Sequence, residues 1–333
     1  MNSVSISLAT YNGEEYLRPL LNSILDQSHK PDEIVACDDG SKDGTINILS
    51  EYQESSSIPF YIYENNTNLG VEKNFEKCLR KSTGDLIAVA DQDDLWKPNK
   101  LEEQIKTYKY SNRGLICHDS RPVSADLSKE YQTLWESGNH NVINKGSEET
   151  FKELLRRNFV QGTTLLLTRE FVDWALPIPD YGYYDYFLGL LAAAVGELRE
   201  INKDLLLYRQ HQGQEIGVRV GMISRIKTGI SRGVVDPELS IERYKELSKM
   251  LQIVIDRLTN TSYVDGNREK IYSELRSRIE YEENRIKTYD PSHPLFRYIY
   301  KNSSNGYYGE YGMGRLTLMK DLLAGGYSKV ARY

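Results

Sequence analysis

Hydrophobic and polar positions follow two different periods along the first hundred residues. Short aliphatic runs, typical of buried strands, are separated by segments whose apolar residues recur every three or four positions, as in helices. The predicted strands are residues 4–8, 34–37, 60–63 and 86–90. The helices between them are residues 45–53, 71–80 and a first helix that ends at Leu25. This order predicts an α/β fold, with a mostly parallel sheet covered by helices.

The first helix has a start signal and one unfavourable residue. Asn12 can cap it, with Glu15 three residues further on, and Leu17 opens a run of apolar residues at helical spacing. Pro19 lies within this run. Because proline lacks a backbone N–H, we expect it to kink or tighten the helix.

Shorter signals follow the fourth strand. The spacing predicts a helix at residues 97–111 and a strand at 115–117, whereas residues 122–146 have little periodicity and predict a long loop. Such a loop in a compact domain is usually functional or mobile. The other predicted elements are a helix at 148–157, a strand at 163–168, a helix at 186–195 and a strand pair at 197–201 and 205–209.

The length favours two structural units, because a single hydrophobic core stops growing at roughly 250–300 residues. We predict an α/β domain at residues 1–215, a linker at 216–238 and a helical C-terminal region at 239–333. The apolar spacing in that last region predicts an antiparallel helix pair joined across residues 260–266.

Residues 296–333 form a basic tail rich in tyrosine. Six Lys or Arg residues stand against Glu310 and Asp321, a net charge of +4, and seven residues are tyrosines. One hypothesis is that the tail makes peripheral contact with the inner face of a membrane, where anionic lipids attract basic segments. The alternative is that the tyrosines pack the helix pair onto the first domain or onto a second subunit, in a homodimer.

Composition and charge narrow the class of protein. Hydrophobic residues make up 39% of the 333 residues and charged residues 27%, and no apolar run approaches the ~20 residues of a membrane span. A net charge of −6 argues against a nucleic acid as partner. The N-terminus lacks the zones of a secretory signal, and the three cysteines (Cys37, Cys78 and Cys117) show no close pairing. We therefore expect a cytoplasmic protein with buried, inert thiols.

Polar residues follow the predicted strands directly, and ligands of open α/β sheets bind at the carboxyl ends of the strands. Residues 10–13, Thr-Tyr-Asn-Gly, are either a site for a nucleobase and ribose or a capped turn. Asp38 or Asp39 could accept the imide N–H of uracil or thymine, although Asp-Gly-Ser is also ordinary turn chemistry. We assign the nearby Asp43 to capping the next helix.

The fourth strand ends in the string Asp91-Gln92-Asp93-Asp94. Three carboxylates within four residues repel one another, so a cation that bridges them to a diphosphate is the simplest reason to place them there. The alternative is a solvated acidic turn that caps the following helix.

A further carboxylate, Asp185, lies at the start of the predicted helix 186–195, and Tyr-Arg-Gln-His (208–211) closes the strand pair. Asp185 could take a proton from an acceptor hydroxyl, or it could be an ordinary helix N-cap. His211 by itself is a polar residue at a strand end.

Together these strings resemble the GT-A-fold glycosyltransferases of family 2, of the bacterial polysaccharide-assembly type. The resemblance covers residues 4 to about 211. The strings that carry it are Ser-Leu-Ala-Thr-Tyr-Asn-Gly (7–13), Cys-Asp-Asp-Gly-Ser-Lys-Asp-Gly-Thr (37–45), Asn-Leu-Gly-Val (68–71), Gly-Asp-Leu-Ile-Ala-Val-Ala-Asp-Gln-Asp-Asp-Leu-Trp-Lys-Pro (84–98) and Tyr-Arg-Gln-His (208–211).

The resemblance implies a role for each matching residue. The nucleotide sugar would be bound by Thr10, Tyr11, Asn12, Asp38, Asp39, Asn68, Asn74, Asp91 and Gln92. Asp93 and His211 would bind Mn²⁺ or Mg²⁺, and Asp185 would be the general base. Relatives often have a histidine directly before this base. This chain has Tyr184 there, so any role of that histidine in relatives is not assigned to this chain.

The implied function is that of an inverting, metal-dependent glycosyltransferase that uses a nucleotide-diphosphate sugar and a glycan, lipid-linked or protein-linked acceptor. The Asp-Gln-Asp-Asp-Leu-Trp string and Gln-Gly-Thr-Thr (161–164) look most like rhamnosyltransferases that use dTDP-rhamnose, and UDP-hexose enzymes carry similar strings. A pyrophosphorylase or a dehydrogenase would need a Gly-rich loop after the first strand, which Thr-Tyr-Asn-Gly is not. The other alternative is a catalytically silent, nucleotide-sugar-binding subunit of a glycan assembly complex.

Overall fold

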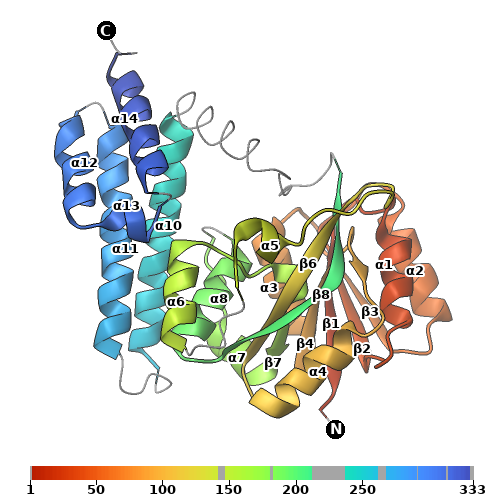
Figure 1. Cartoon of the computed structure of the whole chain (residues 1–333). Helices are drawn as coiled ribbons and strands as arrows, with labels where there is room; N and C mark the ends of the chain where they lie inside the picture. Colours follow the sequence, from red (N-terminus) through yellow and green to blue (C-terminus); the bar gives the residue numbers. More distant parts are fainter. Residues whose placement is uncertain are drawn as a thin grey trace. The chain divides into compact units, whose positions relative to one another are not determined.

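The computed structural model describes residues 2–141, 147–180, 183–211, 237–261, 268–290, 292–312 and 314–330. The chain divides into two compact units (Figure 1). The N-terminal unit comprises Met1–Ser147 and Phe159–Val218, and the C-terminal unit comprises Glu148–Asn158 and Arg219–Tyr333. This division differs from the predicted one in residues 148–158, which group with the C-terminal helices.

An eight-stranded sheet forms the centre of the N-terminal unit (Figure 1). Its strands are β1 (Val4–Thr10), β2 (Glu33–Asp38), β3 (Phe60–Glu64), β4 (Leu86–Asp91), β5 (Leu95–Trp96), β6 (Leu115–Ser124), β7 (Leu166–Thr168) and β8 (Leu198–Gln210), in the order β3-β2-β1-β4-β7-β6-β8-β5. β1 to β4 are parallel. β7 is antiparallel to both β4 and β6, and β8 is parallel to β6. Consequently β1, β2, β4, β6 and β8 all end at one edge of the sheet.

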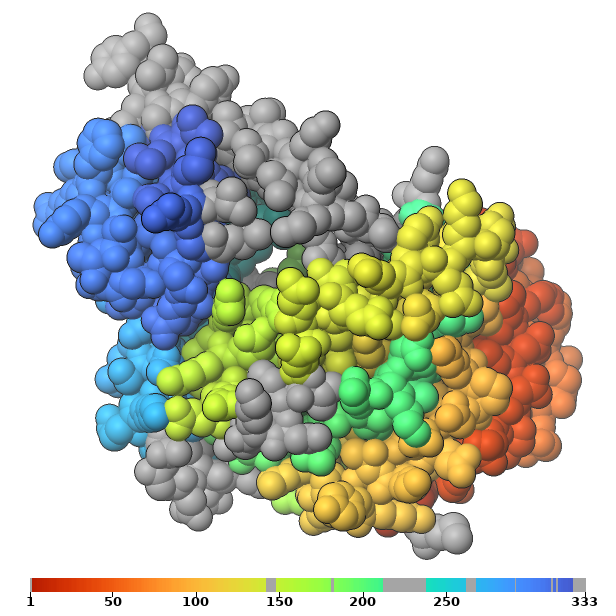
Figure 2. Space-filling view, in the orientation of Figure 1, coloured from red at the N-terminus to blue at the C-terminus, as the bar shows by residue number. Residues whose placement is uncertain are grey.

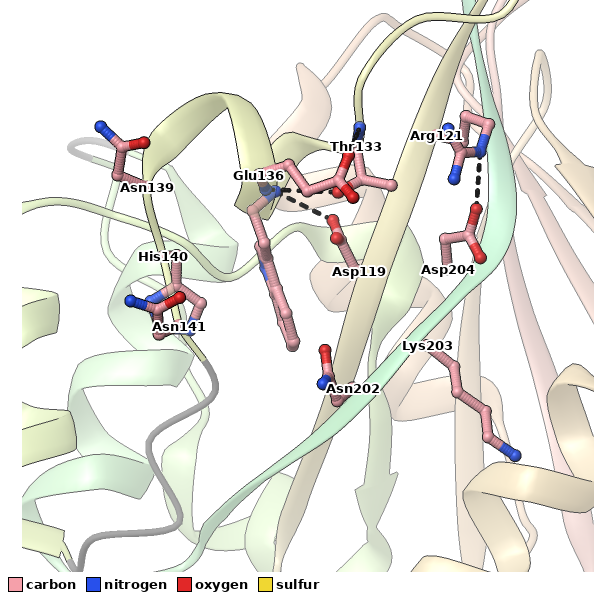
Figure 3. Close-up of a pocket in the computed structure, with 11 residues that line it drawn as sticks. Asp119, Arg121, Thr133, Glu136, Asn139, His140, Asn141, Asn202, Lys203 and Asp204 are labelled. Carbon is pink, nitrogen blue, oxygen red and sulfur yellow. Dashed lines mark hydrogen bonds and ion pairs between the residues drawn. The ribbon is translucent and has the colours of Figure 1, made fainter.

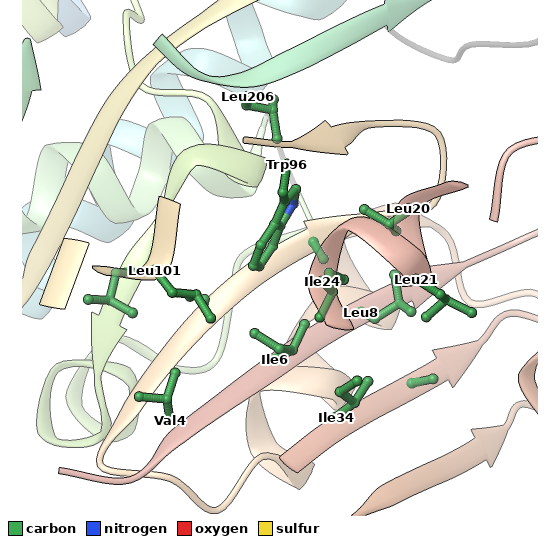
Figure 4. Close-up of a cluster of buried hydrophobic side chains, with 14 of the residues drawn as sticks. Val4, Ile6, Leu8, Leu20, Leu21, Ile24, Ile34, Trp96, Leu101 and Leu206 are labelled. Carbon is green, nitrogen blue, oxygen red and sulfur yellow. The ribbon is translucent and has the colours of Figure 1, made fainter. Parts of the chain in front are cut away.

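Helices cover both faces of this sheet. They are α1 (Leu17–Leu25), α2 (Thr45–Ser55), α3 (Val71–Lys81), α4 (Lys100–Ser111), α5 (Leu134–Gly138), α7 (Arg169–Ala175), α8 (Tyr184–Ala194) and the 3₁₀ turn η1 (Gly162–Thr164). Successive side chains of a strand point to opposite faces of the sheet, and both faces of this sheet are buried. Val4, Ile6 and Leu8 join the main core cluster with Leu20 and Ile24 of α1 (Figure 4).

The opposite face holds a smaller cluster under α3. Val35 and Cys37 of β2 pack there with Cys78 of α3. All three cysteines are buried and free, as the sequence predicted. Burial raises the pKa of the Cys78 and Cys117 thiols, which favours the inert, protonated form.

The start of α1 differs from the prediction. Asn12 has a left-handed backbone with φ of 49° and caps no helix, and α1 begins at Leu17 after Tyr16. Pro19 therefore lies in the first helical turn, where a backbone N–H has no intrahelical acceptor, so its missing donor costs little. The N-cap of α2 is Gly44 and not Asp43, although Asp43 accepts a hydrogen bond at 3.1 Å from the backbone N–H of Thr45, the first residue of that helix.

Three predictions in the second half of the N-terminal unit were wrong. The expected strand pair at 197–209 is one strand, β8. The expected loop after residue 122 contains the end of β6 and helix α5. The strand expected from residue 163 starts only at Leu166, because residues 162–164 form η1, and helix α7 was not predicted.

The C-terminal unit is helical. Its elements are α6 (Ser147–Arg156), α10 (Pro237–Thr259), α11 (Arg268–Tyr289), α12 (Leu295–Ser304), α13 (Tyr307–Glu310) and α14 (Arg315–Val330). The predicted pair is present as α10 and α11, which pack together. The predicted linker, residues 216–238, lies outside the described residues except for its last two, which begin α10.

Three tyrosines of the basic tail pack within this unit. The rings of Tyr307, Tyr308 and Tyr311 are buried and contact the ring of Tyr281 on α11. These residues therefore hold α13 against the helix pair. Among the helices of the described ranges, none combines the length and the hydropathy that crossing a bilayer requires.

Candidate active site

The turn after β2 is organised by Asp38. Its Oδ1 accepts hydrogen bonds from the hydroxyls of Thr10 (2.9 Å) and Ser41 (2.5 Å), and its Oδ2 accepts from the backbone N–H groups of Gly40 (3.1 Å) and Ser41 (2.8 Å). A carboxylate has about four lone-pair sites, so these bonds occupy all of them. Asp38 therefore shapes the loop at the end of β1 and β2 and has no acceptor site left for a base.

Asp39 accepts three hydrogen bonds from the described residues, one fewer than Asp38. Its Oδ1 accepts from the side chain of Asn65 (2.7 Å) and the backbone of Leu69 (2.8 Å), and its Oδ2 accepts from the backbone of Gly70 (2.9 Å). One lone pair of Oδ2 remains. Gly70 has a φ of 85°, a left-handed conformation that favours glycine and that starts α3.

The two predicted asparagines differ in environment. Asn74 is buried and donates to the backbone carbonyls of Cys37 (2.9 Å) and Thr10 (3.4 Å), so it ties α3 to the ends of β1 and β2. Asn68 is exposed and accepts from the backbone N–H of Gly70 at 3.1 Å. Asn74 thus holds the ends of β1 and β2 in place from the buried side, whereas the side chain of Asn68 lies on the surface.

Gln92 joins the loops after β1 and β4. Its side-chain amide donates to the backbone carbonyl of Tyr11 and accepts from the backbone N–H of Tyr11, both at 2.8 Å. A Cβ at Gly13 would lie 2.2 Å from Gln92 Oε1, so only glycine fits beside this amide. The ring of Tyr11 is 44% exposed at this edge of the sheet. Asn12 accepts from the backbone N–H of Lys42 at 2.8 Å and steadies the same edge.

The acidic turn after β4 meets the end of β8. Nε2 of His211 lies 2.9 Å from Oδ2 of Asp93, and both side chains are mostly buried. The guanidinium of Arg209 donates to the backbone carbonyl of Asp93 at 3.0 Å and also to the carbonyl of Ala125. The backbone N–H of Arg209 donates to Oδ1 of Asp94 at 3.3 Å. Asp93 and His211, which the resemblance named together as metal ligands, are therefore in contact in the structure.

Asp185 is linked to the acidic turn through η1. The backbone N–H of Gly162 donates to Asp185 at 3.2 Å, and the carbonyl of the next residue, Thr163, accepts at 2.8 Å from Lys100, whose pKa burial lowers and the charge of Asp94 raises. Burial raises the pKa of the Tyr208 phenol, and the charges of Asp94, Asp93, Asp91 and Asp185 raise it further. The charge of Asp185 therefore acts on the same phenol as the charges of the acidic turn.

Asp185 lies in the first turn of α8. The N-cap is Tyr183, so Asp185 is not the cap that sequence reasoning left open. Its oxygens accept from the backbone N–H groups of Tyr186 (2.6 Å) and Gly162 (3.2 Å), and these bonds fix its orientation. The positive end of the helix dipole favours the ionised form of a carboxylate there.

Tyr184, which stands where relatives often have histidine, is buried and stacks on Phe75 with ring centroids 4.4 Å apart. A Cβ at Gly162 would lie 1.8 Å from the Tyr184 hydroxyl. Gly162 thus leaves the space that the Tyr184 hydroxyl occupies, and the stacking of Tyr184 on Phe75 packs the start of α8 against α3.

Two buried ionisable residues, Asp94 and Lys100, lie beneath the acidic turn. Burial and the charges of Asp93 and Asp91 raise the pKa of the Asp94 carboxyl well above its usual range. Burial lowers the pKa of Lys100, and the charge of Asp94 opposes that effect. The Lys100 ammonium donates to the carbonyl of Thr163 at 2.8 Å and lies 3.4 Å from the centre of the Trp96 ring.

Three residues of this site were given no role by the sequence. Tyr16 lies between Arg209 and His211, with its ring centre 4.7 Å from the Arg209 guanidinium carbon and 4.7 Å from the His211 ring. Tyr208 and Arg209 belong to a string that the resemblance singled out, and that string was the available signal. Nothing in the spacing around Tyr16 indicated its position.

A divalent cation fits beside Asp93 and His211. Neighbouring ligands of an octahedral ion at ~2.1 Å are about 3 Å apart, and the two side-chain atoms are 2.9 Å apart. Among the described residues no group of three or more His, Cys, Asp or Glu side chains is arranged as a metal site. Within the described part of the chain, an ion here would be held by these two side chains, and diphosphate oxygens and water would be suitable further ligands.

The edge of the sheet thus combines loops suited to a nucleotide with a carboxylate cluster, which is the arrangement of a nucleotide-sugar enzyme of the GT-A fold. Residues 5–173 match the family described as glycosyl transferase family 2, about half of the chain. The chain belongs to this family.

Relatives by sequence carry similar names. The chain is 26% identical over 278 residues to the dTDP-rhamnosyl transferase RfbG of Shigella flexneri, a match that covers 80% of this chain and 89% of that protein. It is 37% identical over 128 residues to a Bacillus subtilis (strain 168) protein named as glycosyltransferase EpsE, covering 36% of this chain and 46% of the relative. The chain thus spans less than half of that relative.

Solved structures agree on the fold. Residues 1–349 of TarS from S. aureus, in complex with UDP-GlcNAc, superpose with a TM-score of 0.57 at 15% identity, covering 99% of this chain and 91% of that one. The mannosyltransferase PcManGT from Pyrobaculum calidifontis, in complex with GDP-Man and Mn²⁺, gives 0.52 at 15% identity, with coverages of 99% and 87%. At this identity the likeness establishes the GT-A fold.

Proposed function

We propose that this protein is an inverting glycosyltransferase that moves a sugar from a nucleotide-diphosphate donor to an acceptor hydroxyl in the synthesis of a bacterial surface polysaccharide. The observation that carries the proposal is the edge of the sheet where Asp93 lies 2.9 Å from His211 and where the backbone N–H of Gly162 holds Asp185 at 3.2 Å. The name of the Shigella relative favours dTDP-rhamnose as donor, and the ligand of TarS favours a UDP-hexose.

For the nucleotide, we assign the base to the edge formed by Tyr11 and Asp39. The exposed side chain of Tyr11 can stack on a base. From the described residues, Oδ2 of Asp39 accepts one hydrogen bond, whereas the other oxygens of Asp38 and Asp39 accept two each. Asp38 and Asn74 then hold the loops, and Asp91 lies near the ribose. Thr10, Asn12, Asn68 and Gln92 complete the proposed donor site.

For the transfer step, the acceptor oxygen attacks the anomeric carbon from the face opposite the diphosphate. The bond to the diphosphate breaks as the new glycosidic bond forms, which inverts the anomeric configuration. Asp185 accepts the hydroxyl proton during attack, because an aspartate is ionised at neutral pH. Asp93 and His211 would hold Mn²⁺ or Mg²⁺, which when bound offsets the negative charge that builds on the leaving diphosphate.

Replacing Asp93 by alanine should abolish metal-dependent nucleotide binding. Removing one of the two proposed protein ligands should weaken the affinity for UDP or dTDP in the presence of Mn²⁺ by at least about tenfold, an effect of ~1.4 kcal/mol. Isothermal titration with each nucleotide, with and without Mn²⁺, measures this. Asp26→Ala is the matched control, because Asp26 is an exposed carboxylate at the end of α1. Equal metal-dependent binding by Asp93→Ala and Asp26→Ala would exclude Asp93 as a ligand.

The silent-subunit alternative makes a different prediction for the unaltered protein. An active transferase slowly passes the sugar to water, so a panel of nucleotide sugars with Mn²⁺ should release nucleoside diphosphate from one donor. A silent subunit binds a donor and releases none. The same experiment identifies the donor, because the carboxylate cluster acts only on the nucleotide sugar that the base site accepts.

We also propose that the C-terminal unit makes peripheral membrane contact. Four large apolar side chains are more than half exposed on α12 and α14: Phe296 (72%), Tyr300 (74%), Met319 (57%) and Leu323 (54%). They lie in a segment with a net charge of +4. Burying apolar side chains in the interface and attracting anionic lipids would act together.

Serine at both Phe296 and Leu323 should therefore reduce sedimentation with anionic phosphatidylglycerol vesicles, and neutral phosphatidylcholine vesicles should bind the unaltered protein less. Tyr110→Ser is the control, because Tyr110 is 87% exposed on α4 of the N-terminal unit. If the double variant and Tyr110→Ser sediment equally well, the membrane proposal is wrong.

A further inference from the structure

A cavity lies on the N-terminal unit, apart from the residues assigned to the donor. Its volume is about 640 Å³, within the ~300–1,000 Å³ of small-molecule sites. β6, β8 and the segment of α5 line it, and none of the predicted site residues does. Figure 2 shows the yellow segment that includes α5 beside the green segment of β8 on one face of this unit, and Figure 3 shows the lining side chains.

The lining is polar and close to balanced in charge. All eleven lining side chains carry a nitrogen or oxygen atom, including three amides and three carboxylates. The two cations are already paired, because Arg121 lies 2.7 Å from Asp204 and Lys203 lies 2.8 Å from Glu103. A free phosphate or diphosphate would need unpaired cations, and a lipid chain would need apolar walls. A ligand with many hydroxyl groups fits this lining best.

The wall formed by α5 is rigid before any ligand binds. Thr133 and Glu136 form a reciprocal capping box at the start of α5. The backbone N–H of Trp135 donates to Asp119 of β6 at 3.0 Å, and its indole N–H donates to the carbonyl of Phe159 at 2.9 Å. A pre-formed polar site loses little conformational entropy on binding.

The segment after α5 is fixed in the same way. The His140 ring stacks on Phe159 with centroids 3.9 Å apart, and its Nε2 lies 3.2 Å from Glu200. His140 is 6% exposed, and its Nδ1 has no hydrogen-bond partner among the described residues. Trp135 and His140 are both buried, so they support the wall from behind, and its amides and carboxylates would make the hydrogen bonds to a sugar.

The cavity is connected to the reaction site by β8. Asp204 lines the cavity, and β8 continues from it for six residues to Gln210, directly before His211, which lies 2.9 Å from Asp93. The donor residues occupy the ends of β1, β2 and β4, and the cavity lies beside β6 and β8, which stand beyond β7 in the strand order. The position therefore suits the acceptor better than the donor.

We propose that this cavity binds a sugar unit of the acceptor glycan, away from the hydroxyl that is attacked. This inference rests on the proposed function and adds to it that the acceptor is an oligosaccharide chain with at least one unit beyond the attacked sugar. Asn141 and Asn202 would provide the main hydrogen bonds, since both are exposed and their side-chain amides make no hydrogen bond within the described residues.

The test uses the full chain and direct binding of free oligosaccharides. The probes are di- and trisaccharides of rhamnose, glucose and N-acetylglucosamine, observed by saturation-transfer NMR. Asn202→Trp fills the cavity and should weaken binding of the best probe by at least about tenfold, and Asn141→Ala should weaken it less, as expected for the loss of roughly one neutral hydrogen bond. Asn47→Trp, the same substitution at an exposed position of α2, should bind as the unaltered protein does.

Two outcomes would overturn the inference. One is that no probe binds, or that Asn202→Trp binds as well as Asn47→Trp. The other is that excess UDP or dTDP with Mn²⁺ displaces the oligosaccharide, which would place the sugar in the donor site. Release of nucleoside diphosphate by the unaltered protein tests the proposed function separately, so a failure of the cavity and a failure of the transferase can be distinguished.

Discussion

Replacing Asp185 by asparagine should nearly abolish sugar transfer and leave donor binding unchanged. Asparagine has almost the same shape and can keep one of the two backbone hydrogen bonds to Gly162 and Tyr186, but its amide cannot take a proton at neutral pH. Loss of a general base typically costs a factor of about 10²–10⁴ in rate. The rate of donor hydrolysis in the presence of Mn²⁺ measures the loss, and titration with UDP or dTDP measures the binding.

The matched control is Asp173→Asn on α7. Asp173 is a surface carboxylate that pairs with Arg169 at 3.4 Å, one helical turn away, and exposed pairs of this kind contribute little to stability. A circular-dichroism melting curve for each variant shows that the fold is intact. Hydrolysis by Asp185→Asn within about threefold of the Asp173→Asn rate would remove Asp185 as the base, since even the weaker general bases contribute more than that.

The strand ends were predictable because they depend on local patterns. The runs before residues 10, 38 and 91 are aliphatic and short, and each is followed at once by polar residues. Parallel pairing then brings the ends of β1, β2 and β4 to one edge without further information. The proximity of Asp93 and His211 was available only through the resemblance, because 118 residues separate them.

The single strand β8 could not be read from its own residues. Residues 201–204, Ile-Asn-Lys-Asp, look like a turn between two strands. In the structure β6 has register shifts between His118 and Asp119 and between Asp119 and Arg121, opposite this polar stretch. Such irregularities bend a strand without ending it. Pairing with β6 therefore explains why residues 198–210 form one strand and not two.

Helix α5, in contrast, had a sequence signal that periodicity alone missed. Thr133 and Glu136 have the three-residue spacing of a capping box, and both of its hydrogen bonds form. The helix is too short to show a 3.6-residue period, and only its cap distinguishes it from a loop.

Buried polar residues were the other failure. Lys100 and Asp94 look exposed in a polar segment, yet both are fully buried, because Trp96 and the carbonyl of Thr163 surround the ammonium. No pattern in a short window predicts a partner 63 residues away. The buried residues beneath the site therefore depend on tertiary contacts and could not be predicted, whereas the residues at the strand ends could be predicted from local patterns.

Replacing Asp321 by alanine should destabilise the C-terminal unit strongly. Asp321 is fully buried on α14 and is the shared acceptor of its core. Arg285 donates to it from Nε at 3.0 Å and from Nη2 at 2.8 Å, and the hydroxyls of Tyr289 and Tyr308 donate at 3.0 and 3.1 Å. The alanine variant leaves a buried guanidinium and two buried hydroxyls without this partner, which should cost about 3–5 kcal/mol.

Guanidinium denaturation followed by two probes separates this effect from the rest of the chain. All three tryptophans (Trp96, Trp135 and Trp174) lie in the N-terminal unit, so their fluorescence reports that unit, while far-ultraviolet circular dichroism reports all helices. A loss of this size should lower the midpoint of the circular-dichroism transition by about 0.5–2.5 M, given slopes of roughly 2–6 kcal/mol/M. Asp256→Ala, at an exposed carboxylate of α10, should shift it little. Equal midpoints for the two variants would mean that Asp321 does not hold the helices together, because a buried acceptor of four hydrogen bonds cannot be removed without cost unless water replaces it.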